Sequence, residues 1–539
     1  MQIQLLSIFL TIIAIVILVN SPLVKAQSIC FKFGIILLLL AIASIRIFHY
    51  DTQMGLNLDE AMGGYNAWSL AHYGLDSALH ENPVYLYAWG TGMNVLYPLI
   101  AIPFVKLLGL NLIAYRLPMV LLSIFSAFVL LIGMLKYKLP NKLIILSLLT
   151  IFLSPWSMMA NRWALESNLF PIIFCLAAAA YLFFLSQKKT DRLKRHISLF
   201  LFVFMIAISA YAYSNNWLML PIFFCAIFLS LYLHKQITAL EILGSFLVTL
   251  LIVWPLLLFV KINFLGGKTV HFFMLTIPKL SSSRSNSELV IGHGHLLQAI
   301  FNNIDQFVRL IVTGNDHLIW NSLPQIGIFY PIMFVFALIG LYVALLKRTQ
   351  WDDFMLISLI ACLPIILIVK INVNHLNALM LPILYLEARG LDSIVQNRLL
   401  KISFALMFSA LFVVFTIFYF KIDQTDLSQG RTLTPEVLGQ AVRFADQQKT
   451  DKIYAACFPK GGYVIPLFYT PVSPIIFNHE KAAESFKTES NYSSYGKWFF
   501  KTPHQLSKNS LLIMKKGQKM PFSLKNKREK TFGQYRVYY

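Results

Sequence analysis

The sequence predicts an α-helical protein that crosses a membrane many times and carries a small α/β domain at its C-terminal end. The chain of 539 residues is 58% hydrophobic and only 13% charged, whereas in a soluble domain roughly a quarter of the residues are charged. Apolar runs recur along most of the length and suit the roughly 20 residues that a bilayer crossing needs. The residues after 420 are instead of mixed polar composition. These observations exclude a soluble globular enzyme.

We expect about twelve membrane-spanning helices, because the apolar runs have helical length. They lie near residues 4–20, 33–49, 112–135, 143–160, 168–186, 197–213, 217–233, 239–260, 326–346, 354–369, 376–388 and 402–420. The N-terminus has no basic segment ahead of its first run, so we expect that run to be a retained span rather than a cleaved signal.

Basic residues mark alternate gaps between these runs, for example Lys142, Lys347 and Arg389. By the positive-inside rule these gaps are cytoplasmic. The predicted order is two N-terminal transmembrane helices (1–50), a first extracytoplasmic loop (51–111), transmembrane helices (112–260), a second extracytoplasmic loop (261–325), further transmembrane helices (326–420) and a soluble extracytoplasmic domain (421–539). Functional groups are expected in the outer loops, where binding residues tend to gather.

The formal net charge of +21 would suggest nucleic acid in a soluble chain. Here most basic residues outside the tail lie in short gaps between apolar runs, which indicates topology, so we expect membrane lipids and no nucleic acid as partners. The tail has nineteen Lys and Arg against nine Asp and Glu. This surplus is either a solvated surface or an attraction to an anionic membrane or wall polymer. The five cysteines show no disulfide or zinc pattern.

The tail alternates turn signals with short apolar runs. Extended segments are expected at residues 452–458, 463–469 and 534–539, and a helix near 435–448. A second helix-like piece, residues 296–312, is expected either to lie on the membrane surface or to cover a functional site on the outer side.

Two adjacent carboxylates, Asp59 and Glu60, follow the second apolar run directly. Asp59 is placed to cap a helix that runs to about Tyr73, with Glu60 in its first turn and Gly74 at its end. One interpretation is a capped surface helix. The other is a functional site, because carboxylates at a membrane surface are costly unless they are solvated, paired or used.

Further polar residues lie in the same loop and at the outer ends of later spans. Arg116 and Arg162 either snorkel, pair with a carboxylate or bind an anion. Candidate contacts to a substrate or a metal ion are His80, Glu81, Asp316 and His317. The sequence leaves open whether the protein binds a divalent ion such as Mg²⁺ or Mn²⁺. Side chains that could ligate it, without a fixed ligand spacing, are Asp59, Glu60, His80, Glu81 and His317.

These segments together resemble a known family. The quoted motifs are Asp59-Glu60, Asn82-Pro83-Val84-Tyr85, Arg116-Leu117-Pro118, and Ser154-Pro155-Trp156 with Arg162. They resemble the membrane glycosyltransferases of the C-type (GT-C) fold, in particular bacterial relatives of protein O-mannosyltransferases and lipid A aminoarabinose transferases, called glycosyltransferase family 39. The resemblance is good over residues 51–185 and looser around Asp316.

The resemblance implies a hexosyltransferase of the cell envelope that uses a sugar linked by phosphate to a polyprenol. It implies a glycan, lipid or protein acceptor on the outer face, Asp59 as catalytic base, Glu60 as its motif partner and Arg116 near the donor phosphate. Two departures are an extra span before the motif and Asn82-Pro83 in place of a His-Pro-Pro or Lys-Pro-Pro stretch.

The expected chemistry fits these residue types. A departing polyprenyl phosphate needs positive electrostatic help, which Arg116 and Arg162 can supply, and the acceptor hydroxyl needs a base such as Asp59. A single base predicts inversion at the anomeric carbon. The alternatives are a flippase or transporter of a lipid-linked saccharide, and a non-catalytic membrane scaffold. Transporters usually carry ionisable groups near the bilayer midplane, whereas these spans hold few charges.

Overall fold

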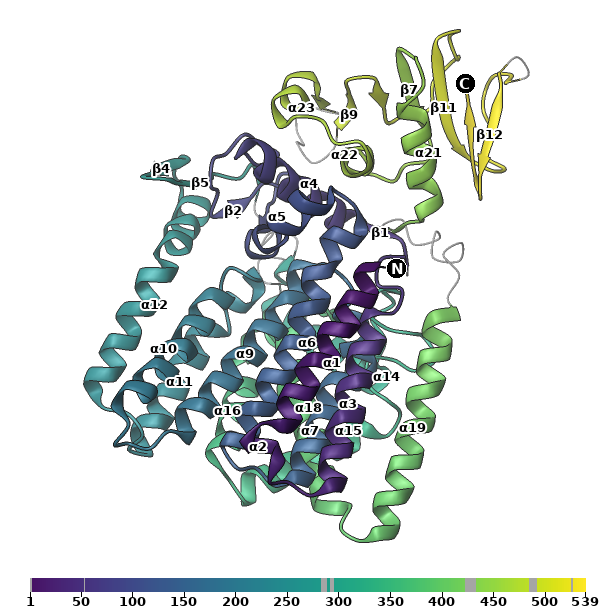
Figure 1. Ribbon diagram of the computed structural model, residues 1–539. Helices are drawn as coiled ribbons and strands as arrows, with labels where there is room; N and C mark the ends of the chain where they lie inside the picture. The colour runs from purple at the N-terminus through teal and green to yellow at the C-terminus, as the bar shows by residue number, and fades with distance from the viewer. Residues whose placement is uncertain are drawn as a thin grey trace. The chain divides into compact units, whose positions relative to one another are not determined.

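The computed structural model describes residues 2–52, 54–282, 288–290, 295–421, 433–483, 492–524 and 527–539 (Figure 1). In these ranges seven helical segments are long and apolar enough to cross a membrane. They are α1 (Gln2–Asn20), α3 (Ile29–Ile47), α6 (Leu112–Lys136), α9 (Glu166–Ser186), α12 (Ala239–Val260, continued by a π-helical turn to Leu265), α16 with α17 (Gln350–Ile368) and α19 (Arg398–Lys421). The chain is a multi-pass membrane protein; the count of about twelve crossings stays a prediction.

The other helices are shorter or more polar. Four apolar ones are α5 (Leu96–Leu108), α7 (Asn141–Leu153), α11 (Leu220–Leu233) and α15 (Met333–Leu346). Further helices in the described ranges are α2 (Pro22–Lys25), α8 (Pro155–Ala160), α10 (Arg192–Ser209), α14 (Leu296–Thr313) and α18 (Asn377–Ile394). By their internal contacts the residues form two compact units, which we call the helical unit (Met1–Tyr50, Met119–Trp254, Ser287–Lys421) and the mixed unit (Asp51–Pro118, Pro255–Asn286, Ile422–Tyr539).

Helix α18 is the centre of the helical unit and contacts α7, α9, α15 and α16. It approaches α15 so closely that a Cβ atom on Gly340 would lie 1.8 Å from the Leu386 carbonyl oxygen, and one on Gly390 would lie 2.0 Å from the Phe336 carbonyl oxygen. Only glycine permits this approach. Small residues are the usual means of close helix packing in membranes, where apolar burial alone gives little drive to associate.

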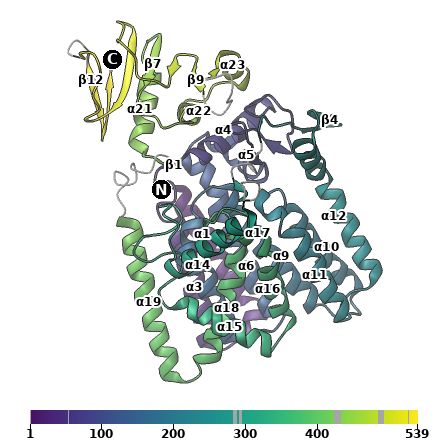
Figure 2. The ribbon, with the colours of Figure 1, turned by 180° about the vertical axis from the view of Figure 1, so that it is seen from behind.

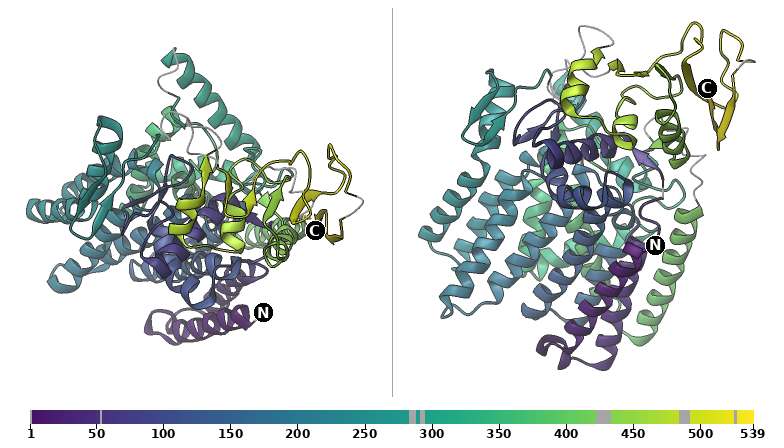
Figure 3. Two further views of the ribbon diagram at one scale, coloured as in Figure 1. Left: turned by 90° about the horizontal axis from the view of Figure 1, so that it is seen from above. Right: turned by 45° about the horizontal axis from the view of Figure 1, so that its top comes forward.

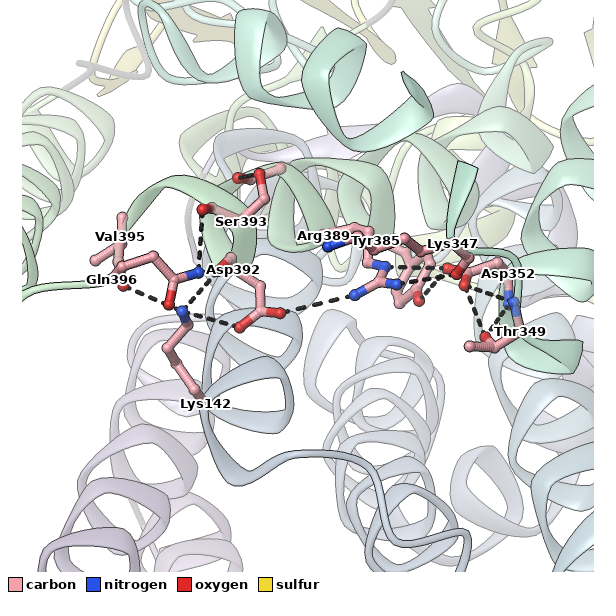
Figure 4. Close-up of polar contacts among 11 residues, drawn as sticks. Lys142, Lys347, Thr349, Asp352, Tyr385, Arg389, Asp392, Ser393, Val395 and Gln396 are labelled. Atoms are coloured by element: carbon pink, nitrogen blue, oxygen red, sulfur yellow. Dashed lines mark hydrogen bonds and ion pairs between the residues drawn. The ribbon is translucent and has the colours of Figure 1, made fainter. Parts of the chain in front are cut away.

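The polar end of α18 is held by charged groups (Figure 4). Tyr385 donates a 2.7 Å hydrogen bond to Asp352 of α16, whose carboxylate also accepts from the backbone of Thr349. Arg389 lies 3.4 Å from Asp352, and Lys142 of α7 lies 3.1 Å from Asp392. Asp352 is fully buried, so these partners compensate a charge that would otherwise be costly to bury.

The helix predicted at residues 296–312 is α14, which lies against α17 (Figure 2). The buried Asn303 amide of α14 donates to the carbonyl oxygens of Ile366 and Val369, at 2.8 and 2.7 Å. Ile366 belongs to the last turn of α17 (Leu363–Ile368) and Val369 is its C-cap, where no further helical turn supplies donors. Asn303 therefore satisfies the end of one helix from the middle of another.

The mixed unit contains a seven-stranded sheet in the order β12-β13-β11-β7-β10-β9-β8 (Figures 1 and 3). Strand β7 is parallel to its neighbours β10 and β11, and the other pairs are antiparallel. The strands are β7 (Lys452–Ala455), β8 (Ala482–Ala483), β9 (Tyr492–Tyr495), β10 (Trp498–Phe499), β11 (Ser510–Lys515), β12 (Glu529–Phe532) and β13 (Tyr535–Tyr538).

In the described part of the tail the helices are α21 (Glu436–Asp446), α22 (Val464–Tyr469) and α23 (Pro474–Glu480). The prediction of an extended segment at residues 463–469 was wrong, because this run is helical. Pro466 is at the third position of α22, in the first turn, where a missing N–H leaves no hydrogen bond unmade. The run is buried around its circumference, and burial on every side hides the helical period from the sequence.

Candidate functional site

The Asp59-Glu60 motif lies in the first turn of α4 (Leu58–Tyr73), within the mixed unit. The prediction that Asp59 caps this helix was wrong, since the N-cap is Asn57. Its side-chain oxygen accepts from the Asp59 N–H at 2.9 Å, and Glu60 accepts from the Asn57 N–H at 3.1 Å. This reciprocal capping box satisfies the exposed backbone donors. The cap therefore does not require the Asp59 carboxylate, which is half-buried and near the positive end of the helix dipole.

Glu60 is paired with Arg116 in a buried, two-pronged ion pair. The Arg116 Nε and Nη2 atoms lie 2.8 and 2.7 Å from the two oxygens of Glu60, and both side chains are at most 1% exposed. Arg116 also donates to the carbonyl oxygen of Gly55. Such bidentate pairs fix the relative orientation of the two side chains and also strengthen the interaction between them. The two motif carboxylates thus differ in environment: Glu60 is bound into the fold, and Asp59 lies beside it in the same turn.

Two glycines in the middle of α4 let other segments approach it closely. A Cβ atom on Gly63 would lie 2.1 Å from the Tyr115 hydroxyl, and one on Gly64 would lie 2.7 Å from the Phe468 ring of α22. Tyr65 donates a 2.9 Å hydrogen bond to the carbonyl of Val472, and burial raises the pKa of its phenol. Helix α4 is therefore enclosed by the first turn of α6 and by the C-terminal tail.

The two segments predicted to be extracytoplasmic loops meet within the mixed unit. The Val84 N–H donates to the Thr276 carbonyl at 3.0 Å, and the Thr276 N–H donates to the Asn82 carbonyl at 3.2 Å. Thr276 belongs to the hairpin of β4 (Val270–Phe272) and β5 (Leu275–Ile277). The ring of Tyr85, in β2 (Tyr85–Leu86), stacks on Phe259 with centroids 4.4 Å apart. The Asn82-Pro83 stretch is thus part of an ordered layer, with β2 paired to β3 (Met93–Asn94).

His80 and Glu81 lie in the turn that follows α4. His80 Nδ1 is 3.2 Å from the carboxylate of Asp76, which also accepts from the backbone N–H groups of Ala78 and His80 at 2.8 Å. Asp76 is fully buried, while Glu81 is exposed. Asp76 therefore organises this turn and holds the His80 ring.

The remaining predicted site residues belong to the helical unit. Arg162 is buried, donates to the carbonyl of Ile45 and lies over the rings of Tyr419 and Phe420 at 5.4 and 5.0 Å. Asp316 accepts from the Asn321 amide and the Val373 N–H, at 2.7 and 2.9 Å. His317 is exposed and has a positive φ of 62°. Asp59, Glu60, His80, Glu81 and Arg116 form the other set, in the mixed unit.

Comparisons with known proteins bear on this arrangement. No protein-family model and no curated protein matches the chain. Among solved structures, ArnT from Cupriavidus metallidurans in the apo state matches 94% of this chain and 98% of its own, with 11% identity and a TM-score of 0.54. The same enzyme bound to undecaprenyl phosphate matches with 10% identity and a TM-score of 0.50. The apo oligosaccharyltransferase of Archaeoglobus fulgidus covers 82% of this chain and 64% of its own, with 10% identity and a TM-score of 0.50.

These neighbours are GT-C glycosyltransferases. The chain has the GT-C fold. The resemblance seen in the motifs is confirmed at the level of the fold, and the shared architecture extends over the tail as well as the helices, since the ArnT match covers nearly the whole chain.

Two residues next to the motif were not predicted from the sequence to be important for it. The Asn57 side chain accepts from the Asp59 N–H, and the Asp76 carboxylate accepts from the His80 N–H. The spacing of Asn57 and Glu60 is that of a capping box and would have identified the true N-cap. No such signal marked Asp76. No three His, Cys, Asp or Glu side chains gather as a metal site within the described ranges.

Proposed function

We propose that this protein is a membrane glycosyltransferase that transfers a sugar from a polyprenyl-phosphate-linked donor to an acceptor at the extracytoplasmic face. The observation that carries the proposal is the GT-C fold with Asp59 in the first turn of α4, beside a Glu60 that is already bound by Arg116. A matched ArnT structure contains undecaprenyl phosphate, a polyprenyl phosphate of the class that the proposed donor would release. A cell-wall polymer, a glycolipid and a protein are the acceptor classes to test.

In the proposed reaction the acceptor hydroxyl oxygen attacks the anomeric carbon while Asp59 accepts its proton. The bond between that carbon and the phosphate oxygen breaks, and the polyprenyl phosphate leaves with the electron pair. A base of this kind typically contributes 10²- to 10⁴-fold to the rate. Since one displacement occurs on the face opposite the leaving group, the product has inverted anomeric configuration.

The burial of the Arg116–Glu60 pair supports a division of labour between the two carboxylates. Glu60 already accepts from Arg116 and from the Asn57 backbone, so a proton on Glu60 would break a compensated buried pair. Asp59 lies half-buried in the same turn, at the positive end of the helix dipole, and the helix is capped by Asn57. We therefore assign proton acceptance to Asp59 and the positioning of the first turn to Glu60.

Arg116 and Arg162 are the proposed sources of positive charge for the departing phosphate. Preorganised cations stabilise charge that develops in a transition state without reorganising at that moment. Both guanidinium groups are held in place, Arg116 by Glu60 and Gly55, and Arg162 by Ile45 and two aromatic rings. His80, Glu81, Asp316 and His317 are proposed to contact the substrates.

The test compares Asp59→Asn with a matched control, Asp305→Asn. Asp305 lies on the surface of α14 and forms an exposed pair with Arg309. A strain lacking the protein is complemented with each variant, and the sugar composition of its surface glycans is measured. We expect the wild type and Asp305→Asn to restore one missing sugar and Asp59→Asn, expressed at the same level, to restore none. Restoration by Asp59→Asn would refute the assignment of the base.

A further inference from the structure

A short strand from the tail is paired with the segment that leads into the motif helix. Strand β6 (Leu433–Thr434) runs antiparallel to β1 (Leu56–Asn57), with Leu56 opposite Thr434 and Asn57 opposite Leu433. Both strands belong to the mixed unit. Asn57 is the residue whose side chain accepts from the Asp59 N–H. The tail backbone therefore holds the residue that fixes the backbone of Asp59.

The residue before β1 shows how tight this pairing is. Gly55 has a φ of +69°, and a Cβ atom there would lie 2.4 Å from the Thr434 carbonyl oxygen and 3.2 Å from the Cα of Pro435. The left-handed backbone at this position already favours glycine. The nearby Thr434 carbonyl adds a second, steric reason for glycine. The tail thus leaves room for no side chain at position 55.

The same residue connects the tail to the buried ion pair. The Gly55 carbonyl accepts from Arg116, and Arg116 grips both oxygens of Glu60. Glu60 in turn accepts from the Asn57 N–H. The contacts form a closed ring from β6 through Gly55, Arg116 and Glu60 back to β1. A shift of one buried member of this ring is transmitted to the others. These buried members are Gly55, Asn57, Glu60, Arg116 and Thr434.

We infer that strand β6 is a positioning element of the transfer reaction, which sets where the Asp59 carboxylate lies by holding Gly55 and Asn57. The inference rests on the proposed function, in which Asp59 is the base. The tail has separate anchors on the motif segment: Tyr65 donates to the Val472 carbonyl, and the Asn478 amide donates to the Ser77 carbonyl at 2.8 Å. Loosening β6 alone should therefore leave the tail attached.

The experiment compares Gly55→Ala with Gly74→Ala in the full-length protein. Gly74 also has a φ of +69°, and nothing lies within 4 Å of the Cβ that alanine would add. Both variants carry the same backbone strain, and only Gly55→Ala pushes on Thr434. Hydrogen–deuterium exchange is measured on peptides covering residues 55–60 and 464–469, and kcat and KM for the donor are measured beside Asp59→Asn.

We expect faster exchange at residues 55–60 in Gly55→Ala alone, with residues 464–469 unchanged. We expect kcat to fall by about 10²-fold, the effect of displacing a catalytic group by about 1 Å, while the donor KM changes by less than about twofold. Unchanged exchange at residues 55–60, or a kcat equal to that of Gly74→Ala, would overturn the inference. If Asp59→Asn transfers sugar as well as the wild type, the assignment of Asp59 as the base fails instead. If the wild type transfers no sugar from a polyprenyl-phosphate-linked donor, the proposed function fails.

A second variant covers the case in which Gly55→Ala does not fold. Leu56 and Thr434 face each other across the pair, at a separation that suits a disulfide. A Leu56→Cys/Thr434→Cys protein, oxidised, locks β6 on β1. We expect the locked enzyme to keep the kcat of its reduced form. Loss of kcat on oxidation, recovered on reduction, would show that the pairing must open during turnover and would overturn the inference.

Discussion

The buried Arg116–Glu60 pair allows a quantitative test of how the motif is held. Glu60→Gln keeps the size of the side chain and removes its charge, which leaves the Arg116 guanidinium buried without a counter-charge. Removing one partner of a buried pair typically destabilises by about 3–5 kcal/mol. Since 1.4 kcal/mol is tenfold in an equilibrium, local opening of the first turn of α4 should become at least about a hundredfold more frequent.

A matched control is available in the same unit. Glu436 and Arg443 form a 2.5 Å ion pair whose side chains are 32% and 42% exposed. The same change there, Glu436→Gln, should cost only about 0.2–1 kcal/mol, because solvent screens the pair. The difference between the two variants thus isolates burial from the chemistry of the substitution.

The assay is hydrogen–deuterium exchange of the amides in residues 57–60, read as protection factors relative to the wild type, with residues 436–443 read in the control. A loss of protection smaller than about tenfold in Glu60→Gln, or equal losses at both sites, would refute the reasoning. A Glu60→Gln/Arg116→Met double variant should recover part of the loss, because both charged partners of a buried pair are then removed together.

The remaining predictions concern packing and pH. Gly340→Ala should destabilise the helical unit by about 1–3 kcal/mol or more through overpacking against Leu386, whereas Gly244→Ala, with open space around it, should be neutral or stabilising; thermal unfolding in detergent decides, and equal midpoints would contradict us. Burial raises the pKa of Tyr65, Tyr463 and Tyr495 above the unfolded value near 10. Their contribution to stability is therefore complete below about pH 10 and is lost as the pH rises further. The thermal unfolding midpoint of the mixed unit should therefore decrease when the pH is raised from about 10 to about 11. The decrease should be smaller in Tyr495→Phe.

Several features of this protein could be predicted from composition and local pattern. Apolar runs of bilayer length indicated the multi-pass fold, and the amphipathic run at residues 296–312 gave α14, because helical periodicity is a local property of the sequence. The tail helix at 435–448 was found as α21 for the same reason. The motif segments also indicated the GT-C fold, which the matched structures confirm.

The cap of the motif helix shows where local reasoning fell short. Asp59 and Asn57 are both good N-caps, and the choice between them depends on Glu60 reaching back to the Asn57 N–H. That contact is in turn held by Arg116, which lies far along the chain. The run at 463–469 was misjudged because burial on all sides removes the periodic signal that separates a helix from a strand.

The sequence by itself determined the class of protein, the membrane-spanning character and the two carboxylates of interest, since each follows from residue type and near-neighbour spacing. Only the tertiary structure decided that Glu60 belongs to Arg116, that Gly63 and Gly64 make room for Tyr115 and Phe468, and that the tail strand β6 lies on β1. These are contacts between residues far apart in the chain. Their energies come from burial and shape, which no local pattern of residues encodes.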